Sequence, residues 1–128
     1  MTKLEKSTVM VRDCTVSMLR GGTGAPLLYL HGAGGAPVEL PFMTALADSF
    51  DVMVPEHPGF GGSDEPDWLD NIHDVAYFYL DFLDALDLDG VHLVGSSLGG
   101  WVALEIAVRS TARLASLTLG APAGLYVY

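Results

Sequence analysis

A Gly-x-Ser-x-Gly motif at residues 95–99 constrains the fold of this chain more than any other feature. A strand-like run, residues 91–94, precedes the motif, and a helix-like run begins near Leu98. A sharp turn from strand to helix needs small residues on both sides of the serine, because the backbone there is strained and closely packed. The Ser97 hydroxyl is therefore expected at a helix N-terminus, where developing negative charge is stabilised.

Strand-like and helix-like segments alternate along the whole chain. Short continuous apolar runs predict strands buried in a parallel sheet, and apolar spacing of three and four residues predicts helices. Two strands near the N-terminus, connected at Asp13-Cys14, predict an antiparallel hairpin. The sequence thus indicates one α/β domain over residues 1–128, with a mostly parallel, doubly covered sheet. The expected strands are 7–12, 15–20, 26–30, 52–54, 91–95 and 114–119, and the expected helices are 37–50, 71–88 and 98–109.

Two local features of these elements can be stated in advance. Asn71 or Asp70 is expected to cap the helix over 71–88. The helix over 98–109 is apolar nearly all round and is therefore expected to be buried.

Composition restricts the partners and the location that can be expected. A net charge of -10 argues against binding to nucleic acid or to an anionic membrane surface. No apolar run reaches the roughly 18 residues of a membrane span, and the first residues lack a signal-peptide pattern. The single cysteine, Cys14, excludes an internal disulfide and fits a reducing compartment, so we expect a cytoplasmic protein. No metal-ligand cluster or dinucleotide motif is present, so no metal and no cofactor are predicted.

Three glycine-rich motifs each follow a predicted strand. They are His-Gly-Ala-Gly-Gly at 31–35, Pro-Gly-Phe-Gly-Gly-Ser-Asp at 58–64, and the Gly-x-Ser-x-Gly motif at 95–99. In this order and spacing they resemble the α/β-hydrolase fold superfamily, in which the serine turn is called the nucleophile elbow. The resemblance covers essentially the whole chain but only the N-terminal half of the usual family fold. It implies a truncated core that lacks the last strands and the lid.

The resemblance implies roles for individual residues. Ser97 would be the nucleophile of a serine hydrolase, and the backbone N–H of Leu98 would be one donor of its oxyanion hole. The second donor would be the N–H of Ala33, in the loop after the strand over 26–30. Gly32 would line the site and leave room for substrate to approach the backbone. Each such donor contributes roughly 10²–10³-fold in rate.

The chain departs from the family pattern after the serine. The family's acid and base follow the nucleophile, but the 31 residues after Ser97 contain no histidine and no aspartate. Glu105, within the predicted helix, is the only acidic residue there. Two of the four earlier histidines fall near the predicted site. His31 is interpreted as ordering the oxyanion loop, and His57 is the only candidate for a substitute base.

Three interpretations of function remain open at this point. The first is a serine hydrolase acting on a carboxylic ester or a C–C bond of a small molecule, weak or inactive alone because the catalytic Asp and His are missing. The second is a non-catalytic α/β module that self-associates or binds a small apolar ligand. The third is an engineered or truncated fragment of half the fold. Serine rather than aspartate at Ser97 argues against the dehalogenase and epoxide-hydrolase branches.

The last predicted strand, Leu114–Leu119, is expected to lie at an edge of the sheet. Its outer side has no partner within the chain, and an apolar edge with unpaired N–H and C=O groups favours association. We therefore expect either a homo-oligomer, such as a homodimer, or a missing C-terminal half to cover this edge.

Overall fold

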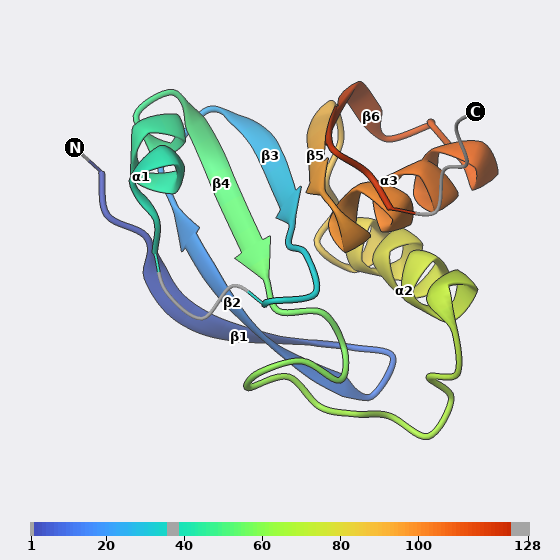
Figure 1. The fold of residues 1–128 in the computed structure, drawn as a ribbon. Helices are drawn as coiled ribbons and strands as arrows, with labels where there is room; N and C mark the ends of the chain where they lie inside the picture. Colours follow the sequence, from blue (N-terminus) through green and yellow to red (C-terminus); the bar gives the residue numbers. More distant parts are fainter. Residues whose placement is uncertain (1, 36–38, 124–128) are drawn as a thin grey trace.

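The computed structural model describes residues 2–35 and 39–123, and these form one mixed sheet flanked by helices (Figure 1). The strand order is β1-β2-β4-β3-β5-β6. The strands are β1 (Glu5–Val11), β2 (Cys14–Gly21), β3 (Ala25–Leu30), β4 (Phe50–Pro55), β5 (Val91–Ser96) and β6 (Leu114–Gly120), and the helices are α1 (Pro41–Ala47), α2 (Ile72–Ala85) and α3 (Leu98–Arg109).

The sheet is mostly parallel, with an antiparallel hairpin at its N-terminal edge, as the sequence predicts. β1 pairs antiparallel with β2, and β2 pairs antiparallel with β4. β4, β3, β5 and β6 are all parallel. The hairpin turn lies at Arg12 and Asp13, one residue earlier than expected, and both residues have positive φ angles of 52° and 59°. Two positive φ angles are typical of the tight turns that match strand twist.

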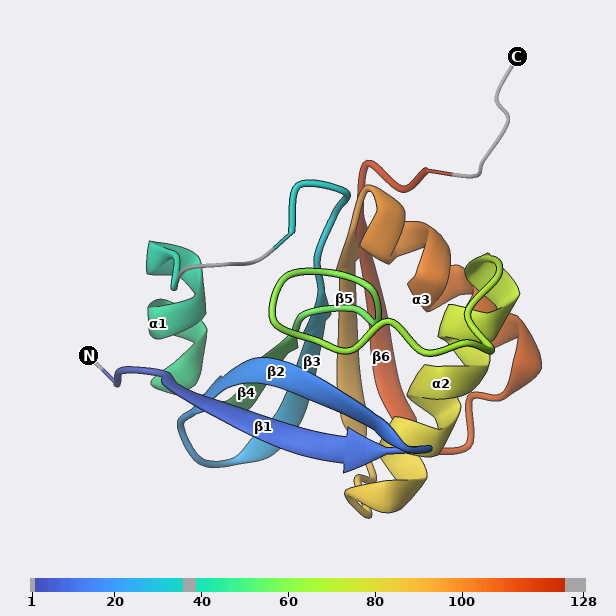
Figure 2. The ribbon, with the colours of Figure 1, turned by 90° about the horizontal axis from the view of Figure 1, so that it is seen from below.

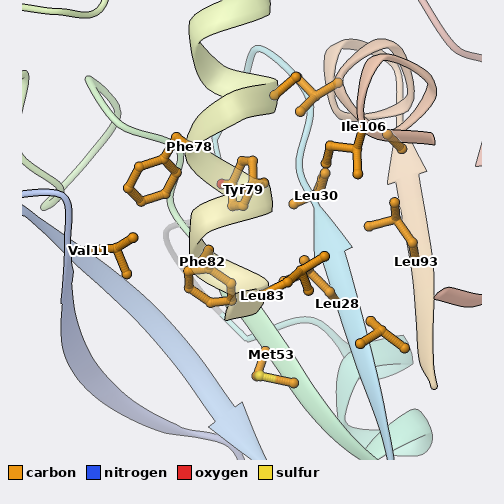
Figure 3. Packing of buried hydrophobic residues seen from close by; sticks show 14 of the residues in the cluster. Val11, Leu28, Leu30, Met53, Phe78, Tyr79, Phe82, Leu83, Leu93 and Ile106 are labelled. Carbon is orange, nitrogen blue, oxygen red and sulfur yellow. The ribbon is translucent and has the colours of Figure 1, made fainter. Parts of the chain in front are cut away.

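Helices cover both faces of the sheet, as expected (Figure 2). Because side chains alternate along a strand, neighbouring residues supply different faces. One face packs against α1 through a small apolar cluster of Leu4, Leu27, Met43, Ala47, Val52 and Val54. The other face packs against α2 and α3 through a larger cluster, including Leu28, Leu30, Met53, Phe78, Tyr79, Phe82, Leu93 and Ile106 (Figure 3).

Helix α2 begins at the predicted cap. The Asn71 Oδ1 atom accepts hydrogen bonds from the N–H groups of His73 and Asp74, at 2.9 and 3.2 Å. The Asp74 carboxylate in turn accepts from the Asn71 N–H at 3.1 Å, which completes a reciprocal cap. The helix ends at Ala85 rather than at 88, because Asp87 adopts a positive φ of 50°.

The expected helix over 37–50 is correct only in its central part. Residues 36–38 lie outside the described part of the chain, and α1 spans Pro41–Ala47 with proline in its first turn, a position that suits proline. Phe50 does not end this helix. It begins β4 instead, where it pairs with Ala25 of β3.

Helix α3 has the predicted bounds, but the expectation that it is buried all round is wrong. Gly99, Val102 and Ile106 are buried, whereas Val108 is 76% exposed. Apolar composition predicted burial on every side, but within residues 2–35 and 39–123 only one side of α3 is covered, by α2 and the sheet. No helix among these residues has both the length and the apolar character needed to cross a membrane.

Strand β6 forms an edge of the sheet, as predicted for residues 114–119. It pairs with β5 on one side, and within the described residues nothing pairs with its other side. Leu117, near its middle, is 37% exposed. A cavity of about 190 Å³ lies beside the strand, lined by Ala107, Thr111, Leu114, Ala115, Ser116 and Leu117.

Candidate active site

Ser97 occupies a strained turn between β5 and α3. Its φ and ψ angles are 54° and -116°, a combination that non-glycine residues rarely adopt. The backbone is held in place because the Ser97 N–H donates to the Gly120 carbonyl at 2.9 Å. The Ser97 carbonyl accepts from the N–H groups of Trp101 and Ala123, at 3.2 and 2.9 Å. The Ser97 side chain is exposed and makes no capping hydrogen bond, so its hydroxyl faces outward at the start of α3.

The glycines of the motif permit close contact between backbones. A Cβ atom on Gly99 would lie 1.9 Å from the Leu30 carbonyl oxygen and 2.6 Å from that of His31. A Cβ atom on Gly95 would lie 2.4 Å from the Gly99 carbonyl oxygen. All three distances are far below van der Waals contact. The approach of α3 to β3 therefore requires glycine at position 99, and the approach of α3 to β5 requires glycine at position 95.

The loop after β3 lies beside Ser97. A Cβ atom on Gly32 would be 3.3 Å from the Ser97 Cβ and 3.8 Å from its Oγ. The loop closes through a hydrogen bond of 3.1 Å from the Gly35 N–H to the Gly32 carbonyl. Among the described residues, the N–H groups of Ala33 and Leu98 have no hydrogen-bond partner. The loop and the serine turn are thus adjacent, as an oxyanion hole requires.

Two buried histidines, His31 and His57, hold the loop after β3 in place through hydrogen bonds. The His31 Nδ1 atom lies 2.6 Å from the Gly32 carbonyl oxygen, and its Nε2 accepts from the His57 N–H at 2.9 Å. The His57 Nε2 atom lies 2.8 Å from the His31 carbonyl oxygen, and its Nδ1 lies 2.6 Å from the Tyr79 hydroxyl. Both imidazole rings are 1% exposed and lie with their centroids 3.8 Å apart.

Burial keeps both imidazoles neutral. Desolvation, followed by the nearby His31 ring, lowers the pKa of His57 from 6.5 to about 3. Desolvation also lowers the pKa of His31, against a smaller opposing effect of its hydrogen bond to Gly32. The contacts of His31 agree with its interpretation as an ordering residue. His57, however, is buried with both ring nitrogens engaged, which contradicts the hypothesis that it substitutes for the catalytic base.

The sequence analysis gave no role to the hydroxyl of Tyr79, a residue of the predicted helix over 71–88. Tyr79 is fully buried on α2, and burial raises its pKa well above 10.0. A buried tyrosine hydroxyl almost always finds a hydrogen-bond partner. That rule, applied to a tyrosine on a core-facing helix, was the signal that could have linked Tyr79 to one of the histidines.

The loop after β4 is anchored to β2. The Ser63 hydroxyl donates to the Glu56 carbonyl at 2.7 Å and accepts from the Ser17 N–H at 3.0 Å. The Asp64 carboxylate accepts from the Thr15 N–H at 2.8 Å. These contacts explain the Ser-Asp pair that ends the glycine-rich segment, and they hold His57 at the base of the loop. Within residues 2–35 and 39–123, no cluster of three or more His, Cys, Asp or Glu residues is arranged to hold a metal ion.

Comparison with known proteins agrees with this geometry. The sequence model of the alpha/beta hydrolase fold family matches residues 25–125. The chain belongs to the α/β-hydrolase fold family. The matched region of this chain includes β3, the loop beside Ser97, the serine turn and β6.

Proteins similar to this chain include two enzymes with named activities and a hydrolase of known structure. A 2-hydroxymuconate semialdehyde hydrolase of a Pseudomonas species is 36% identical over 109 residues, which cover 81% of this chain and 38% of that protein. The dihydrolipoyllysine-residue acetyltransferase component of the acetoin cleaving system of Cupriavidus necator is 33% identical over 106 residues, which cover 82% of this chain and 28% of that protein. The solved structure of a serine hydrolase involved in carbazole degradation has a TM-score of 0.88 at 27% identity, and the match covers 97% of this chain and 50% of that one.

The α/β-hydrolase chain spans only part of these proteins. It covers 28% and 38% of the two curated relatives and 50% of the carbazole-degradation hydrolase. The similarity therefore concerns only part of each of these proteins.

Proposed function

We propose that this chain carries the nucleophile and the oxyanion hole of a serine hydrolase that cleaves a carboxylic ester or a C–C bond in a small molecule. The observation that carries the proposal is the strained turn at Ser97 beside the loop at Gly32. A positive φ at a serine costs on the order of 1–3 kcal/mol, and such strain clusters at functional sites. The hydrolases among the relatives support the reaction class.

The proposed chemistry follows from the positions of the groups. The Ser97 Oγ attacks the carbonyl carbon of the substrate, and negative charge develops on the carbonyl oxygen. The N–H groups of Ala33 and Leu98 stabilise that charge, and the start of α3 adds a favourable dipole. In this proposal Gly32 lines the oxyanion side of the site, while His31 and His57 lie beneath it.

The base that accepts the Ser97 proton is proposed to come from polypeptide outside residues 1–128. Among the described residues, every histidine already has partners. His31 and His57 bind each other and the loop, His73 contacts Glu105 at 2.9 Å, and His92 contacts the Ser116 hydroxyl at 2.7 Å. The 128-residue chain alone is therefore proposed to be weak or inactive.

Labelling with a fluorophosphonate tests this function. We expect the 128-residue chain to react slowly and only at Ser97, because loss of the base of a catalytic triad lowers turnover by roughly 10⁶-fold. Intact-mass spectrometry should show one adduct in the parent and none in Ser97→Ala. Ser96→Ala is the matched control and should retain the adduct. Labelling that persists in Ser97→Ala would exclude Ser97 as the nucleophile, and rapid labelling of the parent would contradict the missing base.

The second candidate function is self-association, and the edge strand β6 favours it. No charged residue occurs in Leu114–Gly120, so no side-chain charge protects this edge. We propose that the outer side of β6 pairs with a strand of a second copy, giving a homodimer, or with a strand of a longer polypeptide that supplies a C-terminal half. Nucleic acid and membrane are not proposed partners, given the net charge of -10. The single, buried Cys14 supports a cytoplasmic location.

Lysine at Leu117 should abolish self-association of the 128-residue chain. A charge on an edge strand blocks strand pairing between copies, so we expect Leu117→Lys to sediment as a monomer at concentrations where the parent is a dimer. Met10→Lys is the control, because Met10 is 66% exposed on β1, at the opposite edge of the sheet. A monomeric parent at micromolar concentration in analytical ultracentrifugation would rule out the homodimer.

A further inference from the structure

A continuous set of hydrogen bonds links helix α2 to the loop beside Ser97. It begins at the Tyr79 hydroxyl, which lies 2.6 Å from His57 Nδ1. It continues from His57 to His31 through two contacts, of 2.8 and 2.9 Å, and ends with His31 Nδ1 at 2.6 Å from the Gly32 carbonyl oxygen. Figure 3 shows Tyr79 among the apolar side chains that α2 buries against the sheet.

The direction of each hydrogen bond in this network is fixed. Carbonyl oxygens only accept, so His31 donates from Nδ1 to Gly32 and His57 donates from Nε2 to the His31 carbonyl. The neutral rings then have one acceptor each. His31 Nε2 accepts from the His57 N–H, and His57 Nδ1 accepts from the Tyr79 hydroxyl. A proton added to His31 Nε2 would oppose the His57 N–H, so the network requires His31 to be neutral.

The network controls the peptide that carries a proposed oxyanion donor. The Gly32 carbonyl and the Ala33 N–H belong to one planar peptide unit and point in opposite directions when it is trans, and none of the described peptide bonds is cis. The Gly32 carbonyl accepts two hydrogen bonds, from His31 Nδ1 at 2.6 Å and from the Gly35 N–H at 3.1 Å. Fixing this carbonyl therefore fixes the direction of the Ala33 N–H.

We infer that Tyr79 is a positioning residue for the oxyanion hole, acting through His57 and His31 to aim the N–H of Ala33. The inference rests on the proposed function of that N–H. Tyr79 is 0% exposed and both imidazoles are 1% exposed, so solvent has little access to replace a lost hydroxyl. Without the hydroxyl, His57 Nδ1 is a buried acceptor with no donor, and the ring loses one of the contacts that hold it in place beside His31.

The substitution Tyr79→Phe in the 128-residue chain tests this inference by NMR. In the parent, imidazole ¹⁵N spectra should show the Nδ1–H tautomer at His31 and the Nε2–H tautomer at His57. In Tyr79→Phe we expect a changed ¹⁵N shift at His57 Nδ1, which loses its hydrogen-bond donor. We also expect a changed residual dipolar coupling of the Ala33 N–H, which reports the direction of this bond, with that of the Leu98 N–H unchanged. The rate constant for phosphonate capture at saturation should fall about tenfold while the half-saturating concentration stays the same, since a well-placed oxyanion donor contributes 10²–10³-fold.

Tyr29→Phe is the matched control. Tyr29 is on β3, the strand that leads into the loop, but its ring packs against Phe42 on the α1 face of the sheet. This variant should leave the ¹⁵N shift at His57 Nδ1 and the dipolar coupling of the Ala33 N–H unchanged. If Tyr79→Phe does not fold, the parent spectra alone decide, because the Nε2–H tautomer at His31 would overturn the inference.

The outcomes separate this inference from the proposed function. An unchanged ¹⁵N shift at His57 Nδ1 and an unchanged dipolar coupling of the Ala33 N–H in Tyr79→Phe would overturn the positioning role, whatever the reactivity of Ser97. Failure of the parent to form an adduct at Ser97, with the expected changes at His57 Nδ1 and at the Ala33 N–H present in Tyr79→Phe, would instead overturn the proposed function.

Discussion

Alanine at Gly99 should destabilise the chain by about 3–5 kcal/mol, the range of severe core overpacking. The added Cβ atom would lie 1.9 Å from the Leu30 carbonyl oxygen and 2.4 Å from its carbon. These are backbone atoms of β3, which is hydrogen-bonded on both sides within the sheet, so neither can move without cost. The free energy of unfolding in urea, compared with that of the parent, measures the effect.

Gly90→Ala separates steric overlap from backbone strain. Gly90 has a positive φ of 62°, but a Cβ atom there would meet no described atom within 4 Å. Its substitution should cost only about 1–2 kcal/mol, the usual cost of a left-handed conformation for alanine. If Gly99→Ala and Gly90→Ala are equally stable, the close approach of α3 to β3 does not determine the stability of the serine turn.

Motifs with a strong backbone requirement were predictable from the sequence. The turn at Ser97 must pass between β5 and α3 in little space, and only glycine at Gly95 and Gly99 permits it. The hairpin, the parallel strands and the cap at Asn71 also follow from local patterns and were confirmed.

Features that depend on tertiary contacts were not predictable in the same way. Apolar composition could not distinguish the packed side of α3 from the side that carries Val108. Likewise, the spacing of Phe50 fits a helix, but its pairing with Ala25 places it in a strand. His57 was judged by its position at the end of the sheet near Ser97, whereas its chemistry depends on Tyr79, which is 22 residues away in sequence.

Acid should destabilise the folded chain well above the range in which carboxylates titrate. The pKa of His57 is about 3 in the folded protein and 6.5 as the ordinary value, so the unfolded chain binds the proton more tightly. Its contribution to stability is therefore fully present above pH 6.5 and decreases as the pH falls toward 3. From His57 alone we expect the free energy of unfolding to fall by about 2 kcal/mol between pH 7 and pH 5, and by about 4 kcal/mol at pH 3.

The interval between pH 7 and pH 5 isolates the histidine effect. The lowered pKa of His31 acts in the same direction there, whereas the lowered pKa values of Asp48 and Glu105 affect stability only at more acidic pH, below their ordinary values of 3.8 and 4.5. His57→Gln cannot bind the proton, so this variant should be less stable than the parent at pH 7 but should lose about 2 kcal/mol less on acidification. Urea unfolding at a series of pH values gives the pH dependence of the free energy of unfolding for the parent and for His57→Gln. If the free energy of unfolding of the parent does not change between pH 7 and pH 5, His57 binds protons in the folded state as readily as in the unfolded chain. The assignment of a buried, neutral His57 beneath the oxyanion loop would then be wrong.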